Sequence, residues 1–246
     1  MPRPTVPRLH VNIDHVATLR QARREAFPDP LAWALACEAA GAQGITCHLR
    51  KDRRHIQDGD LGRLRAELAT LLNLEVSLDP EMLGIALESG ADAFCLVPEN
   101  RQEVTTEGGL DVIAERDRLA ECVPALAGTG ALVSLFVDPD RAQLDASREV
   151  GAVFVELHTG SYANARGAGR ESELERLRAA AVHAHHIGLR VNAGHGLDYD
   201  NLEPVAALAH LEELNIGFAI VARAVTTGVA EAVRAMLAGI RSAAQQ

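Results

Sequence analysis

Residues 44–55, GITCHLRKDRRH, join a short apolar run to side chains that can bind anions and move protons. In an extended strand alternate side chains share a face. The apolar face of this predicted strand carries Ile45, Cys47 and Leu49. The other face carries Thr46, His48 and Arg50, and further basic residues follow in the loop. Such a strand is either an edge strand with one wet face or a barrel strand whose polar end lies in an active site.

Three other stretches repeat this pattern of apolar residues alternating with polar ones. They lie at residues 9–14 (LHVNID), 73–78 (NLEVSL) and 153–158 (VFVELH). Their polar positions are Asn12 and Asp14, Asn73 and Glu75, and Glu156 and His158. Burying a polar group without a partner costs roughly 1–3 kcal/mol, and more for a charge. Four strands that carry this cost near their ends are better explained by an active site than by stability.

Strand and helix patterns alternate along the whole chain. The predicted strands lie at 9–14, at the start of 44–55, and at 73–78, 94–97, 132–137, 153–158, 189–193 and 214–221. The predicted helices lie at 31–40, 60–72, 80–89, about 111–127, 139–150, about 173–187, about 201–209 and about 229–240. Residues 15–30 and the stretch TGSYANARGAG are predicted as loops.

Eight strand–helix units in about 240 residues are the number and length of a (β/α)8 barrel. We therefore predict an α/β protein whose residues 1–246 form a single barrel domain. The alternative is an open doubly wound sheet, but no GxGxxG follows the first strand, which argues against a dinucleotide-binding fold. In a parallel barrel helices cover the outer strand faces, so the polar sets should point into the lumen.

Composition excludes several classes of function. The net charge of −10 argues against nucleic acid as a partner. Four scattered cysteines without a CxxC pair indicate a reduced, cytoplasmic protein, and no stretch is long and apolar enough to predict a membrane span or a leader. Of the 24 basic residues only Lys51 is lysine, so amine chemistry by the enzyme has one candidate.

A cluster of imidazoles and carboxylates could bind a metal or relay protons. Its predicted members are His48, Glu75, Glu156, His158 and His195. The chain has no HExxH or HxH pair, and Arg50 in the same region disfavours a bound cation. We therefore predict several proton transfers and no metal.

Anion ligands surround the predicted acid–base cluster. His15, Arg23, Arg50 and His55 follow the first two strands, and arginine binds phosphate through paired donors. The segments 194–196 (GHG) and 215–217 (NIG) lie after the seventh strand and at the eighth, where phosphate-binding barrels hold their anions and glycine lets backbone N–H groups reach them. The sequence thus predicts phosphorylated small molecules as substrates.

The longer motifs resemble the pyridoxine 5'-phosphate synthase family. The resemblance covers residues 9–241 and rests on VNIDHVATLRQAR, GITCHLRKDRRHI, NLEVS, LVPENRQEVTTEGGLD, ELHTGSYA, VNAGHGL and ELNIG. It implies a (β/α)8 barrel, assembled as a cytoplasmic homo-octamer and without a cofactor. It also implies condensation of 3-amino-2-oxopropyl phosphate with 1-deoxy-D-xylulose 5-phosphate to give pyridoxine 5'-phosphate, phosphate and water.

The resemblance also implies roles for individual residues. His48 and Glu75 would accept protons, His195 would donate one, and Glu156 would stabilise the transition state. The deoxyxylulose phosphate would be held by Asp14, His15, Arg50, His55 and Thr105. The amino-ketone phosphate would be held by Asn12, Arg23, Gly196, Gly217 and Phe218.

Phe218 departs from the family pattern, since most members have His there, in NIGHAI rather than NIGFAI. We expect the backbone around Gly217 to make the phosphate contact; alternatively, Phe218 packs under the last helix and touches no ligand. Two other functions remain open. One is another phosphosugar barrel enzyme, an isomerase or aldolase, although a Schiff-base aldolase would need a lysine at a strand end. The other is a non-catalytic phosphometabolite-binding protein, which would not need the acid–base cluster.

Overall fold

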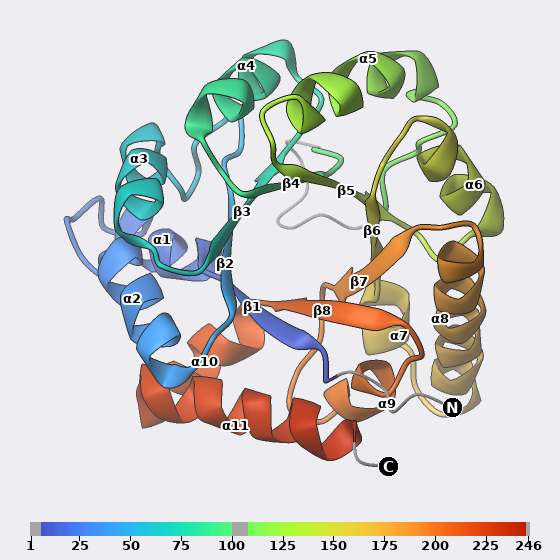
Figure 1. Ribbon diagram of the computed structural model, residues 1–246. Helices are drawn as coiled ribbons and strands as arrows, with labels where there is room; N and C mark the ends of the chain where they lie inside the picture. The colour runs from blue at the N-terminus through green and yellow to red at the C-terminus, as the bar shows by residue number, and fades with distance from the viewer. Residues whose placement is uncertain (1–5, 100–107, 245–246) are drawn as a thin grey trace.

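Eight parallel strands form a closed barrel in chain order in the computed structural model, which describes residues 6–99 and 108–244 (Figure 1). The strands are β1 (Arg8–Asn12), β2 (Gly44–His48), β3 (Leu71–Val76), β4 (Ala93–Leu96), β5 (Leu132–Val137), β6 (Phe154–His158), β7 (Arg190–Gly194) and β8 (Leu211–Ile216). β8 pairs with β1 in register Leu9 to Leu214, which closes the barrel. The predicted α/β barrel is therefore confirmed.

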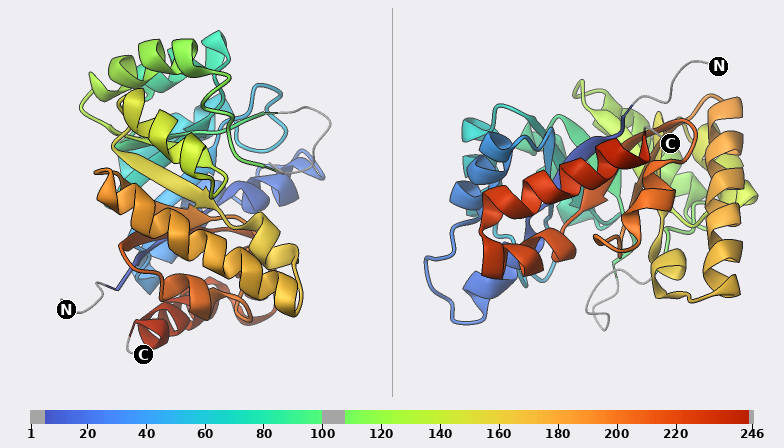
Figure 2. Two further views of the ribbon diagram at one scale, coloured as in Figure 1. Left: turned by 90° about the vertical axis from the view of Figure 1, so that its right-hand side faces the viewer. Right: turned by 90° about the horizontal axis from the view of Figure 1, so that it is seen from below.

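Helices surround the barrel on its outside (Figure 1). They are α1 (Asp14–Gln21), α2 (Pro30–Ala40), α3 (Asp58–Glu67), α4 (Pro80–Ser89), α5 (Arg116–Ala127), α6 (Arg141–Glu149), α7 (Gly160–Asn164), α8 (Ala168–His186), α9 (Leu202–Ala206), α10 (Phe218–Thr227) and α11 (Val229–Ala243). The last helix, α11, packs against α2, so the two ends of the helical ring meet (Figure 2).

Local sequence signals fix where several helices begin and end. Asp29 caps α2 by accepting from the Leu31 N–H, and Pro30 occupies the first turn. Gly41 ends that helix with a φ of 107°, a backbone conformation that glycine adopts at little cost. Asp79 caps α4 in the same way, ahead of Pro80. These local signals set where α2 begins and ends and where α4 begins.

Apolar side chains fill the layer between barrel and helices. Leu9, Val11, Ile45 and Leu74 are completely buried there, as expected for strands covered by helices on their outer face. The lumen side is polar instead. Thr46 Oγ donates to Asn215 Oδ1 at 2.8 Å, and Asn73 Nδ2 donates to Thr46 Oγ at 3.3 Å. The polar strand positions thus point inward, as predicted.

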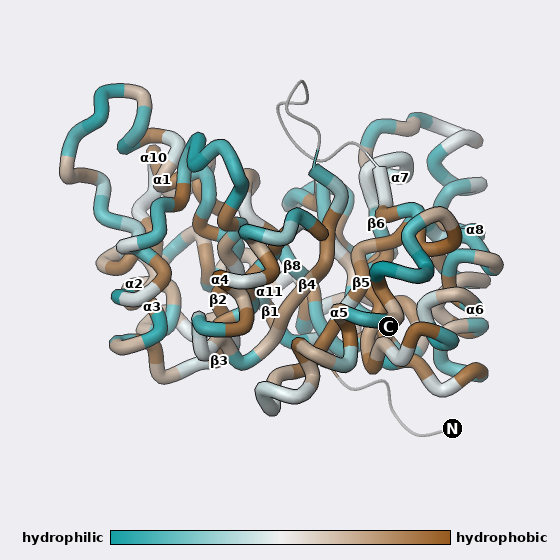
Figure 3. The backbone as a smooth tube through the Cα atoms, turned by 90° about the horizontal axis from the view of Figure 1, so that it is seen from above, coloured by the Kyte–Doolittle hydropathy of each residue, from teal (hydrophilic) through white to brown (hydrophobic). Residues whose placement is uncertain are grey.

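Three short or displaced helices gather at one end of the barrel. α1, α7 and α10 directly follow β1, β6 and β8, and Figure 3 shows all three at the end where the strands finish. The loops at this end are largely hydrophilic (Figure 3). Within the described residues, no helix has the length and apolar character needed to span a bilayer. The carboxyl-terminal end is thus the polar, elaborated end of the barrel.

Several predicted boundaries were wrong. The segment predicted as a loop at 15–30 begins with α1, and the loop after β6 contains α7. The helix predicted at 60–72 ends at Glu67, because Leu71 and Leu72 belong to β3. The strand predicted at 214–221 ends at Ile216, and Phe218 begins α10. Asp14 was expected at the end of a strand but is the first residue of α1.

Candidate active site

A cavity of about 1320 Å³ opens at the carboxyl-terminal end of the barrel. The predicted site residues that line it are Asn12, Asp14, His15, His48, Arg50, His55, Glu75, Glu156, His195, Gly196, Gly217 and Phe218. Arg23 does not line it, because it is exposed in the loop after α1. Thr105 lies outside the described residues. The structure therefore brings together residues that are spread over more than 200 positions of the sequence.

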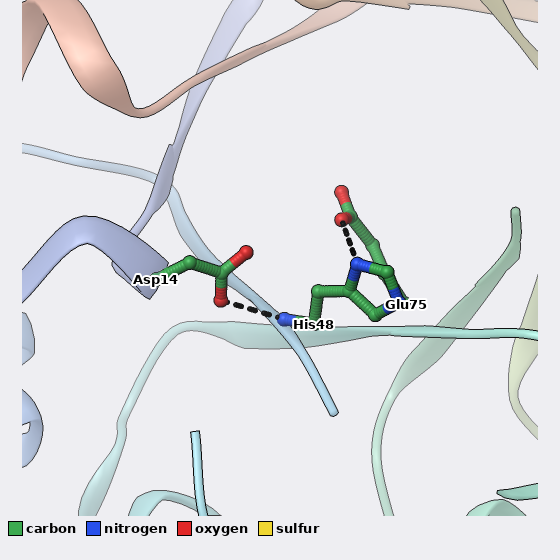
Figure 4. A group of neighbouring side chains, drawn as sticks. All are labelled: Asp14, His48 and Glu75. Carbon is green, nitrogen blue, oxygen red and sulfur yellow. Dashed lines mark hydrogen bonds and ion pairs between the residues drawn. The ribbon is translucent and has the colours of Figure 1, made fainter. Parts of the chain in front are cut away.

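Asp14 joins the ends of the first two strands. Its carboxylate accepts from Asn12 Nδ2 at 3.0 Å and from the His48 backbone N–H at 2.8 Å (Figure 4). The Asp14 N–H donates in return to Asn12 Oδ1 at 2.9 Å. Its place in the first turn of α1 also suits a negative charge, because helix amino termini carry positive partial charge. Asp14 thus fixes the position of His48.

His48 lies between two carboxyl groups. Its Nδ1 is 3.9 Å from Glu75 Oε2, and its Nε2 is 3.8 Å from Glu99 Oε2. Both distances are too long for hydrogen bonds. Burial lowers the pKa of His48 well below its ordinary value, and the nearby His55 and Arg50 lower it further. His48 is therefore a neutral imidazole near neutral pH, able to accept a proton.

The pKa values of Glu75 and Glu156 are shifted in the opposite direction. Burial raises the pKa of Glu75 well above its ordinary value, and the charges of Asp14 and Glu156 raise it further. Burial likewise raises the pKa of Glu156 to about 8, although the hydrogen bond from Asn215 Nδ2, at 2.5 Å, opposes this shift. A carboxyl group that titrates near neutral pH can both take up and release protons during turnover.

His195 stands at the end of β7 with a φ of 82°, a conformation that residues other than glycine rarely adopt. Thr159 holds this backbone, since its hydroxyl donates to the carbonyls of Gly194 and His195 at 2.7 and 2.5 Å. Burial lowers the pKa of His195 to about 4, and the nearby His158 and His15 also lower it. Strained residues held by their surroundings are common at functional sites.

The cavity has cationic and backbone groups that suit phosphate. Arg50, which is only 2% exposed, and His55 line the side that follows β2. On the other side Gly217 precedes α10, whose first N–H groups have no partner within the helix. A Cβ added to Gly217 would lie 3.0 Å from the Asn12 backbone oxygen, so a larger residue would be crowded against Asn12.

Phe218 is the first residue of α10 and lines the cavity with 67% of its surface exposed. Its ring meets the ring of His15 edge-on, with centroids 5.3 Å apart. The side chain therefore does not pack beneath the last helix, which was the alternative expectation for this position.

Two residues escaped the sequence analysis, one beside His48 and one in the cavity lining. Glu99 follows β4, has a side chain only 6% exposed, and accepts from the Lys51 N–H at 3.1 Å. Glu99 lies in the loop after its strand, whereas His48 and Glu156 were singled out by alternation within their strands, so that signal did not reach Glu99. Arg223 of α10 lines the cavity and stacks on Tyr199 at 4.6 Å. Arg223 lies on a helix, and alternation along the strands does not predict which helical side chains reach the cavity.

Asp14, His48 and Glu75 are the described residues that come near enough together to suggest a metal site, with ligand atoms within 4.8 Å of one another. One Asp14 oxygen already accepts from the His48 N–H, and Arg50, whose positive charge also acts on His48, lines the same cavity. A divalent ion would have to compete with that cation. The expectation that no metal is needed stays a prediction.

Comparisons with known proteins agree on one family. Residues 9–242 match the family described as Pyridoxal phosphate biosynthesis protein PdxJ. A pyridoxine 5'-phosphate synthase of Thioalkalivibrio sulfidiphilus is 57% identical over 96% of this chain and 96% of its own. That of Opitutus terrae is 54% identical over 93% and 96%, respectively.

Among solved structures, KGPDC from Streptococcus mutans superimposes with a TM-score of 0.66, covering 97% of this chain and 99% of its own at 14% identity. A 3-hexulose-6-phosphate synthase gives a TM-score of 0.64 over 94% and 99% at 16% identity. Identities this low establish the barrel fold alone. Together with the match over residues 9–242, the synthase relatives show that this chain belongs to the Pyridoxal phosphate biosynthesis protein PdxJ family.

Proposed function

We propose that this protein is a pyridoxine 5'-phosphate synthase. It condenses 3-amino-2-oxopropyl phosphate with 1-deoxy-D-xylulose 5-phosphate to give pyridoxine 5'-phosphate, inorganic phosphate and water. The observation that carries the proposal is one cavity with four perturbed acid–base groups between two anion-binding sides. The four groups are His48, Glu75, Glu156 and His195.

The chemistry of ring closure needs this combination. The substrate amine forms a Schiff base with the other substrate's ketone, and enolisations then precede the loss of water and phosphate. Each step moves a proton, so several bases and acids must lie around one bound intermediate. We assign proton acceptance to His48 and Glu75, which lie on adjacent strands. Glu156, in the middle of β6 and in the cavity lining, stabilises charge that develops across the lumen.

His195 donates a proton only after substrate has bound. With a pKa of about 4 it is neutral in the empty cavity. A phosphate dianion nearby favours the charged form of an imidazole and raises its pKa. Gly196, Gly217 and Asn12 hold the amino-ketone phosphate in this scheme, and the backbone before Phe218 supplies N–H groups. Binding of the phosphate thus favours the protonated form of His195, which can then donate a proton.

The position of Lys51 argues against a Schiff-base aldolase. Its Nζ pairs with Asp79 Oδ2 at 2.5 Å, and Lys51 does not line the cavity. The amine must therefore come from the substrate. The acid–base cluster likewise separates the protein from a phosphometabolite-binding protein, which would need only the anion ligands.

Incubation of the purified protein with both phosphates tests the proposal. We expect the pyridoxine chromophore and free phosphate to appear together in equal amounts, and neither to appear when one substrate is omitted. Phosphate release without pyridoxine 5'-phosphate, or no turnover by correctly folded protein, would reject the assignment. His195→Asn serves as the matched control, because it keeps the fold and removes the proton donor.

We further propose that the chain is a single barrel domain that works in the cytoplasm as a homo-octamer, as the family resemblance implies. Light scattering of the purified protein measures the assembly directly. A mass of eight chains supports it, and a stable monomer or dimer rejects it.

A further inference from the structure

A second acid–base pair, made of a buried histidine and a half-exposed aspartate, lies beside the acid–base cluster. Asp138, the residue after β5, accepts from His158 Nδ1 at 2.8 Å. His158, the last residue of β6, is only 4% exposed, whereas the Asp138 side chain is 48% exposed. The hydrogen bond with His158 holds the pKa of Asp138 below its ordinary value. Asp138 is thus ionised at neutral pH, and its carboxylate accepts the hydrogen bond from His158 Nδ1.

The other nitrogen of His158 has been left without a partner. Nε2 is buried and makes no hydrogen bond to any residue that the structure describes. Such an atom costs free energy, so its presence in a folded protein calls for an explanation. A Cβ added to Gly160 would lie 2.3 Å from His158 Nε2 and 3.2 Å from His195 Cδ2. Glycine at this position therefore leaves the space in which the two rings face each other.

The ring of His158 contacts the ring of His195 directly. Their centroids are 5.2 Å apart and their planes meet at 63°, while Phe136 closes the same contact from β5. The neighbouring Thr159 also holds the backbone of His195. Residues at the end of β6 thus contact both the ring and the backbone of His195. The charged or titratable groups around this contact are Asp138, His195 and His15, with Arg176 acting on Asp138 from α8.

We infer that His158, fixed by Asp138, is a positioning residue that holds the imidazole of His195 in the orientation needed for proton donation. This inference rests on the proposed function of His195. His158 does not line the cavity itself, so it acts through its neighbour rather than on substrate.

The chain supplies a matched control. His183 of α8 makes the same kind of pair with Asp145 of α6, at 2.6 Å, with an Asp side chain 47% exposed. His183 and Asp145 lie outside the cavity lining. Substitutions His158→Gln and Asp138→Asn can therefore be compared with His183→Gln and Asp145→Asn, which remove an equivalent pair elsewhere.

Kinetics test the inference first. We expect His158→Gln to lower kcat about tenfold or more with KM for both phosphates changed less than about threefold, since misplacing a catalytic group costs turnover rather than binding. Asp138→Asn should lower kcat in the same way, and the two control variants should keep wild-type kcat. His158 variants that match the His183 control would overturn the inference.

A double-mutant cycle distinguishes positioning from an independent role. If His158 acts through His195, then His158→Gln adds no further loss to His195→Asn. Losses that multiply would overturn the inference. Imidazole ¹⁵N NMR of the ligand-free protein provides a readout independent of turnover. We expect the His195 signals to shift in His158→Gln and to stay unchanged in His183→Gln. Unchanged His195 signals in both would overturn the inference, whereas an inactive wild type would instead reject the proposed function.

Discussion

The two ends of the barrel lumen each bury a glutamate, but the surroundings of the two carboxyl groups differ. At the amino-terminal end, Glu213 of β8 accepts from Arg8 Nη2 at 2.8 Å and lies 3.0 Å from His10 Nε2. At the carboxyl-terminal end, Glu156 has only the Asn215 amide and the Cys95 thiol, and no ion pair within the described part of the chain.

The pKa values of the two carboxyls shift in opposite directions. Hydrogen bonding and charge from His10 and Arg8 outweigh burial and hold the pKa of Glu213 below its ordinary value. Burial dominates at Glu156 and raises its pKa to about 8. A paired buried charge serves the fold, whereas an unpaired titratable group destabilises the fold and gains reactivity. We therefore call the amino-terminal end of the lumen, around Glu213, the structural end, and the carboxyl-terminal end, around Glu156, the chemical end.

The largest expected effect on stability comes from removing the structural glutamate. Glu213→Ala leaves His10 and Arg8 without their partner and should lower the free energy of unfolding by about 3 kcal/mol, as for other broken buried pairs. Urea denaturation measures this loss. The neighbouring Glu212→Ala breaks a more exposed pair with Arg190 and should cost less than about 1 kcal/mol. Equal losses in the two variants would contradict the distinction.

The largest expected effect on turnover comes from the chemical end. His48→Asn should lower kcat by roughly 100-fold or more, the usual scale for a lost general base, while the fold and substrate binding persist. His10→Asn is the matched control, because it removes a buried histidine from the other end of the lumen. We expect that variant to lose stability and keep turnover. Near-wild-type turnover of folded His48→Asn would end the assignment.

A smaller effect separates backbone from side-chain contacts at the phosphate. Gly217→Val places its Cβ 3.0 Å from Asn12 Cβ and should raise KM for the amino-ketone phosphate strongly. Phe218→His should change that KM by less than about tenfold, or roughly 1.4 kcal/mol, because the backbone makes the contact. Steady-state kinetics with the second substrate saturating measures both. Much tighter binding by Phe218→His would show that this phosphate site is weakened in the present chain.

The smallest effects are expected for lysine and metal. Lys51→Arg keeps the pairing with Asp79 possible and should retain turnover. Dialysis against a chelator should also leave turnover intact, since Arg50 lines the cavity near Asp14, His48 and Glu75. Activity assays before and after chelation measure this directly. Loss on chelation, restored by one divalent ion, would make those three residues a metal site.

Alternation of side chains predicted the barrel because it depends only on local geometry. It failed where the same residues fit both the spacing of a helix and the alternation of a strand. Leu68 and Leu72 continue the helical spacing of Leu61 and Leu64, yet Leu72 belongs to β3. Similarly, FAIV after Gly217 looks like the continuation of a strand but begins α10. Gly217, which follows the end of β8, lies close to Asn12, and this contact links distant parts of the sequence.

The sequence identified most residues of the candidate site but not their pairing. Strand alternation placed Glu156 and His158 together, whereas the partner of His158 comes from the end of β5. His48 lies between Glu75 and Glu99 because of how neighbouring strands are staggered, and no local pattern specifies that stagger. Arg23 was predicted as an anion ligand because it follows the first strand, but it is exposed in the loop after α1 and does not line the cavity.

The pH dependence of stability tests the contrast between the two ends most directly. A glutamate in the unfolded chain has a pKa of about 4.3. With a folded pKa of about 8, Glu156 holds a proton that the unfolded chain has lost. Wild type should therefore lose stability relative to Glu156→Gln as pH rises from about 4.3 to about 8.

Glu213 has a lowered pKa, so the sign is reversed: wild type should lose stability relative to Glu213→Gln as pH falls below about 4.3. Urea denaturation of the three proteins between about pH 2.5 and pH 8.5 gives both difference curves, because the Glu213 effect lies below about pH 4.3. We predict slopes of opposite sign, with the Glu156 difference growing at high pH and the Glu213 difference shrinking at low pH. Two difference curves with the same slope would contradict the division of the lumen into a structural and a chemical end.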